Sequence, residues 1–101
     1  MIVLRFKVQC QPDKIEEVMA AYEDVIPASR ALEGVISFDI GRDVADSNSF
    51  IGTEVFVDQG ALERQESLPE TATVYGVLEK SLVGAPEATI FDVASSRPFE
   101  G

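Results

Sequence analysis

The N-terminal segment of the chain alternates between apolar and polar positions. One face would carry Ile2, Leu4, Phe6 and Val8, and the other would carry mostly polar side chains. Alternation with a period of two is typical of a β-strand that buries one face. The pattern predicts a first strand over residues 1–9.

The period changes to that of a helix after Pro12, a residue that suits the first helical position. Acidic residues follow in the early turns, and the apolar positions form one helical stripe, made of Ile15, Val18, Met19, Tyr22 and Ile26. We expect Pro27 to kink or interrupt this helix, because it lacks the N–H that the preceding turn needs. Gly34 is the predicted stop.

The middle of the chain shows two further strand patterns around a polar turn. Residues 35–43 alternate, with Ile36, Phe38 and Ile40 on one face, and residues 49–57 form the next apolar run. The segment between them is rich in Asp, Ser and Asn, which favour turns. An antiparallel hairpin is predicted.

The last third predicts a helix in two pieces and a final strand. Asp58 is placed to cap a short helix through Gln65, and Pro69 begins a second piece that Gly84 and Pro86 would end. The apolar face of the second piece comprises Thr71, Val74, Tyr75, Leu78 and Leu82. Residues 87–95 read as the fourth strand, which gives a single domain over 1–95 and a loose tail over 96–101.

The order strand, helix, strand, strand, helix, strand is that of the α+β, ferredoxin-like βαββαβ fold. In this plan a four-stranded antiparallel sheet carries its helices on one face. The third strand has apolar residues on both faces, and so does the fourth, with Ile90 on one side and Phe91 and Val93 on the other. The uncovered sheet face therefore predicts a partner, most simply a second copy in a homodimer.

Composition narrows the classes of function. The 101 residues include 8 Lys and Arg against 18 Asp and Glu, a net charge of -10, which disfavours nucleic acid and anionic membranes as partners. The absence of histidine removes the commonest metal ligand, so no metal site is predicted. One cysteine, Cys10, permits no internal disulfide, and neither a signal segment nor a membrane-spanning apolar run is evident. We expect a cytoplasmic protein.

Glu54 is the residue whose type conflicts most with its position. It lies in the third strand among large apolar residues. One interpretation is a structural ion pair with Arg5 or Arg42, which would lower its pKa. The other is a functional carboxyl group in an apolar pocket, which would have a raised pKa.

Three stretches resemble the antibiotic biosynthesis monooxygenase family, whose members are small dimeric α+β barrel proteins. They are RFKVQCQPDKIEEVMAAY, PASRALEGVISFDIGRD and NSFIGTEVFVDQGAL, and the resemblance runs from Ile2 to about Val93. In the third strand and on either side of it, the chain keeps the family's Asn48, Phe50, Glu54 and Asp58.

The chain also departs from the family pattern. Phe56 stands where a Trp is common, and Gln65 and Glu70 stand where His often occurs. The haem-degrading branch of this fold relies on a Trp and a haem-ligating His, and this chain has neither. Haem degradation is therefore excluded.

The resemblance implies a ligand pocket between sheet and helices in each protomer. Period-two counting places one set of residues on its sheet side, namely Leu4, Phe6, Phe50, Gly52, Glu54 and Phe56. Gly52 would leave room for a ligand ring, and Tyr22 or Tyr75 would hydrogen-bond a phenolic oxygen.

The activity implied by the resemblance is a cofactor-independent monooxygenase that oxidises a small phenolic, hydroquinone or polyketide-like ring with molecular oxygen, with Glu54 as the base. Two alternatives stay open. One is a non-catalytic binding or accessory protein that has lost the family's Trp and His. The other is an isomerase or decarboxylase of a small carbonyl compound, since a fold does not decide function.

Overall fold

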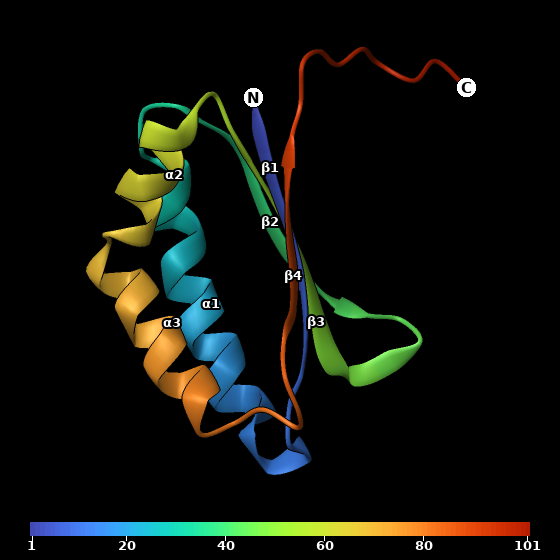
Figure 1. Cartoon of the computed structure of the whole chain (residues 1–101). Helices are drawn as coiled ribbons and strands as arrows, with labels where there is room; N and C mark the ends of the chain where they lie inside the picture. Colours follow the sequence, from blue (N-terminus) through green and yellow to red (C-terminus); the bar gives the residue numbers. More distant parts are fainter.

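A computed structural model describes all of residues 1–101 (Figure 1). The elements in chain order are β1 (Ile2–Gln9), the 3-10 helix η1 (Pro12–Lys14), α1 (Ile15–Arg30), β2 (Val35–Asp43), β3 (Asp46–Phe56), α2 (Gln59–Glu66), α3 (Pro69–Glu79) and β4 (Glu87–Asp92). The strands form one antiparallel sheet in the order β2-β3-β1-β4. All three α-helices lie on the same face of this sheet, and the other face is bare (Figure 1). The predicted ferredoxin-like α+β fold is confirmed.

The pairing of β1 with β3 places the predicted inner residues opposite one another. Leu4 pairs with Glu54, and Phe6 pairs with Gly52. Because alternate residues of a strand share a face, the even-numbered residues of both strands point toward the helices. Strand periodicity alone was sufficient to predict this shared face.

Helix α1 runs through Pro27 and ends at Arg30, so the expected interruption at Pro27 is wrong. Pro27 lies on the exposed side of the last turns, where water can replace the missing N–H as a partner for the freed carbonyl group. Gly34 does reverse the chain before β2, with φ +87°. A Cβ atom there would lie 2.8 Å from the Cβ of Ala61, so the turn needs glycine for both its conformation and its packing.

The β2–β3 turn is shorter than expected. It consists of Val44 and Ala45 alone, and the polar residues that follow belong to β3. Asp46 explains this difference, because its carboxylate accepts hydrogen bonds from the Ser49 hydroxyl at 2.7 Å and from the backbone N–H of Asn48 at 3.1 Å. Side chains that favour turns are thus satisfied inside the start of a strand.

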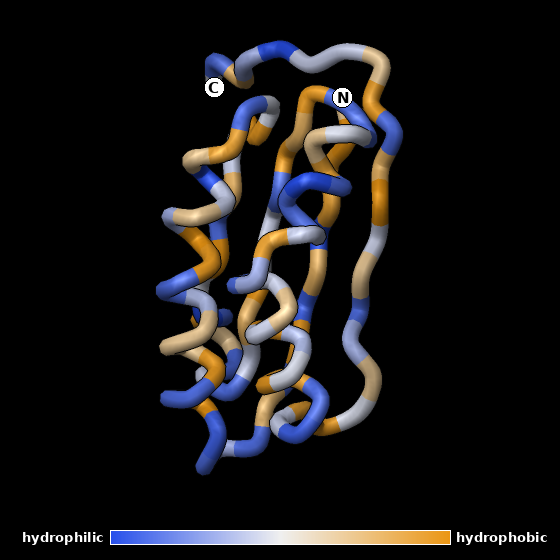
Figure 2. Tube along the Cα trace, turned by 90° about the vertical axis from the view of Figure 1, so that its left-hand side faces the viewer, coloured by the Kyte–Doolittle hydropathy of each residue, from blue (hydrophilic) through white to orange (hydrophobic).

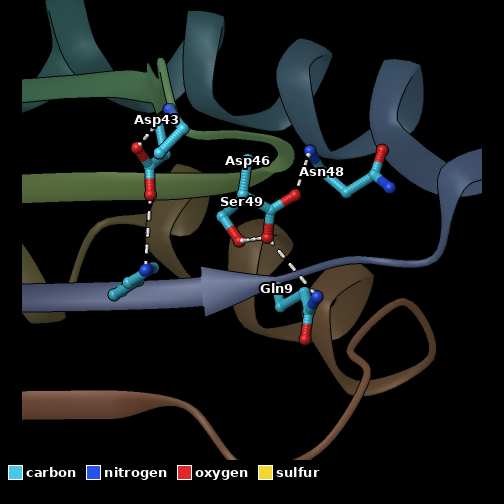
Figure 3. A network of polar contacts seen from close by, with 7 residues as sticks. Gln9, Asp43, Asp46, Asn48 and Ser49 are labelled. Atoms are coloured by element: carbon cyan, nitrogen blue, oxygen red, sulfur yellow. Dashed lines mark hydrogen bonds and ion pairs between the residues drawn. The ribbon is translucent and has the colours of Figure 1, made fainter.

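Figure 3 shows how the same hairpin is tied to β1. Lys7 forms an ion pair with Asp43 at 3.3 Å, and Gln9 donates to Asp46 at 3.4 Å. The hydrogen bonds that Asp46 accepts lower the pKa of its carboxyl group, first through Ser49. These contacts hold the end of the sheet that lies farthest from α2.

The second half follows the prediction at its start and departs from it near its end. Asp58 caps α2 by accepting a hydrogen bond from the amide of Ala61 at 2.9 Å, and α3 begins at Pro69. Helix α3 ends at Glu79, before the expected Gly84, because Leu82 instead forms a β-bridge with Cys10. Strand β4 ends at Asp92, and the residues after it form no helix or strand.

The core has two parts and leaves β4 outside both. The larger cluster lies between α1, α3 and the sheet, and the smaller one contains Ile2, Phe56, Ala61 and Leu62 beneath α2. All six residues of β4 are exposed, and Figure 2 shows this strand running along the edge of the sheet beside the helices. None of the helices combines the length and the apolar character needed to cross a membrane.

Candidate functional site

A cavity of about 310 Å³ lies between the inner face of the sheet and the helices. This volume is near the lower end of the range of about 300–1,000 Å³ for small-molecule sites. Most of its wall is apolar, and the polar groups on it are Tyr22, Glu54, Gln65, Glu66, Thr71, Tyr75 and Glu79. Four predicted site residues besides Glu54 line it, namely Leu4, Phe6, Tyr22 and Tyr75.

Glu54 is a buried carboxyl group without an ion-pair partner. It sits near the centre of the sheet, paired across the strands with Leu4 and Phe38, and is 8% exposed. The three ion pairs of the structure join Lys7 to Asp43, Arg30 to Asp39 and Lys80 to Glu17. The structural ion pair considered for Glu54 is therefore wrong.

The two arginines considered as partners are both placed elsewhere. Arg5 pairs with Thr53, so its side chain belongs to the opposite face of the sheet. Arg42 donates hydrogen bonds to the Ser47 carbonyl group, and its guanidinium lies 5.9 Å from the centre of the Phe50 ring. Neither is available to neutralise Glu54.

Burial raises the pKa of Glu54 to about 8, and the nearby charge of Glu66 adds to the shift. Both causes disfavour the charged carboxylate. At neutral pH the group is therefore mainly protonated, and its pKa is close enough to neutral pH for it to gain and lose a proton there. A carboxyl group with this property can take up and release a proton during a reaction.

Glu66 also holds Tyr75. The hydroxyl of Tyr75 donates toward both oxygens of the Glu66 carboxylate, at 2.8 and 2.9 Å. Burial, followed by the hydrogen bond and charge of Glu66, raises the pKa of Tyr75. Glu66 was absent from the sequence prediction, because an acidic residue on the exposed side of a helix end gives no signal that tertiary packing will bring it to a cavity.

Tyr22 has a fixed ring and a free hydroxyl. The side chain is 4% exposed, and its ring packs at a centroid distance of 6.0 Å from Phe6 and 5.2 Å from Phe50. Its hydroxyl oxygen is buried and has no hydrogen-bond partner. Burial is the main cause that raises the pKa of this phenol, so it stays protonated and can act only as a neutral donor or acceptor.

A buried polar network fixes the end of α2 beside the cavity. The Gln65 amide donates to the hydroxyls of Ser29 and Thr71, both at 3.1 Å, and Thr71 donates back to the Gln65 carbonyl at 2.7 Å. One side chain thereby joins α1, α2 and α3. The polar Thr71 within an otherwise apolar helical face was the available signal for this network.

Three residues expected to bind ligand lie outside the cavity wall. A Cβ at Gly52 would be 2.0 Å from the Phe6 ring, so the space left by this glycine is filled by Phe6 and not by a ligand. Phe50 packs between Tyr22 and Arg42, and Phe56 is fully buried in the smaller core cluster. The strand periodicity gives the correct face of the sheet for these residues, but it does not distinguish a cavity wall from packed core.

The carboxyl groups around the cavity have no basic side chain beside them on its wall. Glu54, Glu66 and Glu79 line it, and no lysine or arginine does. No group of three or more His, Cys, Asp or Glu side chains is arranged to hold a metal ion. The site therefore consists of an apolar space with carboxyl and phenol groups on its wall.

The sequence model of the family described as "Antibiotic biosynthesis monooxygenase" matches residues 1–74. The chain belongs to the antibiotic biosynthesis monooxygenase family. It is 32% identical over 88 residues to the Bacillus subtilis protein named "Putative monooxygenase YcnE", a match that covers 85% of this chain and 90% of that protein.

Solved structures agree with the family fold. Rv0793 from Mycobacterium tuberculosis superposes with a TM-score of 0.86 at 15% identity, covering 96% of this chain and 98% of that one. PA3566 from Pseudomonas aeruginosa superposes with a TM-score of 0.82 at 21% identity, covering 93% of this chain and 94% of that one. In this antibiotic biosynthesis monooxygenase family member, the packed Phe56 occupies the position noted above for Trp, and Glu70 and the hydrogen-bonded Gln65 occupy the positions noted for His.

Proposed function

We propose that this protein is a cofactor-independent monooxygenase that oxidises a small phenolic, hydroquinone or polyketide-like ring with molecular oxygen, with Glu54 as the base. The observation that carries the proposal is the buried, unpaired carboxyl group of Glu54 on the wall of an apolar cavity. Family membership supports the general class of reaction.

The proposed chemistry needs one proton to be removed from the ring. Triplet oxygen reacts poorly with a neutral closed-shell ring, whereas a deprotonated phenol or enol donates electrons much more readily. For a ring that carries a CH₂ group beside its conjugated system, the carbanion forms a bond from carbon to oxygen. Loss of water from the resulting hydroperoxide leaves a carbonyl group. The sum is ring CH₂ plus O₂ giving ring C=O plus H₂O, so the substrate supplies all four electrons.

The cavity supports this step in two ways. A carboxyl group with a pKa of about 8 is a stronger base than an ordinary glutamate and still has an ionised fraction at neutral pH. The apolar wall keeps water from the carbanion, which favours reaction with oxygen over reprotonation by solvent. Tyr22 supplies a phenol close to the bound ring.

Oxygen uptake by the purified protein tests the proposal, with a panel of hydroquinones and anthrones and no added flavin or metal. Glu54→Gln should lower uptake by about a hundredfold to ten-thousandfold, the usual contribution of a general base. Glu23→Gln, on the exposed side of α1, is the matched control and should leave uptake unchanged. Uptake that survives Glu54→Gln would discard Glu54 as the base. No uptake with any ring would favour a binding or accessory protein.

The bare sheet face is the second part of the proposal. Val55, Val3 and Phe91 are neighbours across β3, β1 and β4, and they form an apolar row on the side without helices. Phe91 is 48% exposed. We propose that a second copy of the chain covers this face, as twofold symmetry allows one patch to meet itself.

Light scattering after size exclusion tests the dimer at micromolar concentration. The wild type should have twice the mass of the 11.0 kDa chain. Phe91→Asp should shift the population toward the monomer, because it places a charge in the apolar row. Phe99→Asp, at a position that is 93% exposed in the tail, is the control and should leave the dimer intact. A monomeric wild type would refute this part of the proposal.

A further inference from the structure

The Tyr22 hydroxyl is a hydrogen-bond donor that lacks an acceptor. Only two buried side-chain oxygen atoms in the structure have no partner, and of these two residues, Tyr22 and Glu70, only Tyr22 lines the cavity. Phe6 and Phe50 hold its ring, so the hydroxyl cannot turn far to find water. Buried polar groups are nearly always satisfied, and an exception on a cavity wall points to a missing partner.

The other tyrosine of the cavity is already engaged. The Tyr75 hydroxyl donates its hydrogen bond to the Glu66 carboxylate, so it is not free to donate to a ligand. The amide of Gln65 is likewise engaged, because it donates to Ser29 and Thr71. Tyr22 is therefore the phenol that can donate a hydrogen bond to a bound molecule without breaking one within the protein.

The charges around the cavity restrict the ligand further. Three carboxyl groups line it and no basic side chain does. A carboxylate, sulfate or phosphate on the ligand would lose its water and gain no cation in exchange, and it would also meet the negative charge of Glu66. An uncharged polar atom has neither difficulty.

We propose that the cavity selects uncharged ring ligands with a carbonyl oxygen that accepts a hydrogen bond from the Tyr22 hydroxyl, and that it rejects rings carrying an anionic group. The inference rests on the proposed function and names its substrate class. In the proposed reaction, the carbonyl oxygen becomes the oxygen of the enolate when Glu54 removes a proton. A hydrogen bond from Tyr22 to that oxygen stabilises the developing charge, so Tyr22 acts in binding and in the deprotonation step.

Equilibrium dialysis with three probes that share one bicyclic skeleton tests this inference under argon. The probes are α-tetralone, which has the carbonyl group, tetralin, which lacks it, and tetralin-1-carboxylate, which is anionic. The wild type should bind α-tetralone at least tenfold more tightly than the carboxylate. Glu66→Gln should strengthen binding of the carboxylate by several fold, because it removes a negative charge and keeps an acceptor for Tyr75.

Tyr22→Phe isolates the hydrogen bond. It should weaken binding of α-tetralone by about three- to tenfold, as expected for one neutral hydrogen bond, and change binding of tetralin by less than twofold. The variant keeps the ring that packs on Phe6 and Phe50 and removes a hydroxyl without a partner, so it should unfold at the same denaturant concentration as the wild type.

Four results would overturn the inference: no binding of α-tetralone, no loss with Tyr22→Phe, an equal loss for tetralin, or equal affinity for the anionic probe. The outcome is separable from that of the proposed function, because binding under argon involves no oxygenation. A protein that binds the ketone through Tyr22 but consumes no oxygen keeps this inference and loses the proposed activity. If the protein consumes oxygen and Tyr22→Phe leaves this uptake unchanged, the proposed function is kept and this inference is lost.

Discussion

Glu54 and Phe56 lie two residues apart on the same face of β3, yet their surroundings differ sharply. Phe56 is 0% exposed and packs with Ile2, Ala61 and Leu62 in a closed cluster, whereas Glu54 lies on the wall of a cavity. The difference follows from the helix that covers each position. The capped start of α2 folds directly back over Phe56, and the chain then continues into α3, which forms the far wall over Glu54.

This contrast shows how one strand can serve two purposes. At the Phe56 end, the sheet and α2 are in contact and stabilise the fold through apolar burial. At the Glu54 position, the helices leave space, and a polar group without a partner persists there. Substitution of Phe56 should therefore affect mainly stability, substitution of Glu54 should affect proton binding, and substitution of Gly52 should affect the shape of the cavity.

The largest effect on stability is expected from a substitution at Phe56, where the sheet and α2 are in contact. Phe56→Ala should lower the free energy of unfolding by about 3–5 kcal/mol, because it removes a fully buried aromatic ring and leaves a void. Urea denaturation measures this change. Phe99→Ala, at a position that is 93% exposed, should change stability by less than about 0.5 kcal/mol. Similar losses for both variants would contradict the packing described for Phe56.

A smaller effect is expected from the proton on Glu54. Its pKa rises from 4.5 to about 8 on folding, so the native protein binds a proton that the unfolded chain has released between these values. Stability attributable to this group is therefore fully present below pH 4.5 and declines as the pH rises through about 8.

Glu54→Gln removes this dependence because an amide does not titrate. Relative to the variant, the wild type should lose about 2–4 kcal/mol of unfolding free energy between pH 5 and pH 8. Denaturation curves of both proteins at several pH values give this difference. If the two proteins change in parallel with pH, the carboxyl group of Glu54 has an ordinary pKa.

The smallest of the three effects is expected at Gly52, a residue of β3 whose inner side is covered by the Phe6 ring. Gly52→Ala should destabilise the protein by about 1–3 kcal/mol, because the Phe6 ring must move away from the new methyl group. The displaced ring should also weaken ligand binding at the cavity. Gly41→Ala is the matched strand control, since no atom lies within 4 Å of its Cβ position. Equal stability of both variants would show that Phe6 has room elsewhere.

Much of the fold was predictable because its signals are local. The alternation at Leu4 and Phe6 defined the inner face of β1, and Asp58 and Pro69 marked the starts of two helices. Errors arose where other contacts replaced the expected local preference. Leu82 leaves the predicted helix to bridge with Cys10, and the turn-forming residues near Asp46 join a strand.

The candidate site was only partly predictable for the same reason. Leu4, Phe6, Tyr22, Glu54 and Tyr75 do line one cavity, as their places on the predicted elements allowed. The hydrogen bond from Tyr75 to Glu66 could not be inferred, because it depends on how the end of α2 is positioned by Gln65. The lack of a partner for Glu54 could not be inferred either, because it depends on where the arginines of other elements lie.

By itself, the sequence determined the order of elements, the inner face of the sheet and the presence of one carboxyl group on it. Hydrophobic periodicity and capping act between residues that are close along the chain, so they can be read from it directly. Only the tertiary structure decided that Phe56 is enclosed, that Glu54 has no cation, and that the Tyr22 hydroxyl has no acceptor. These properties depend on the space left when helices dock on a sheet, and that space is set by contacts between residues far apart in sequence.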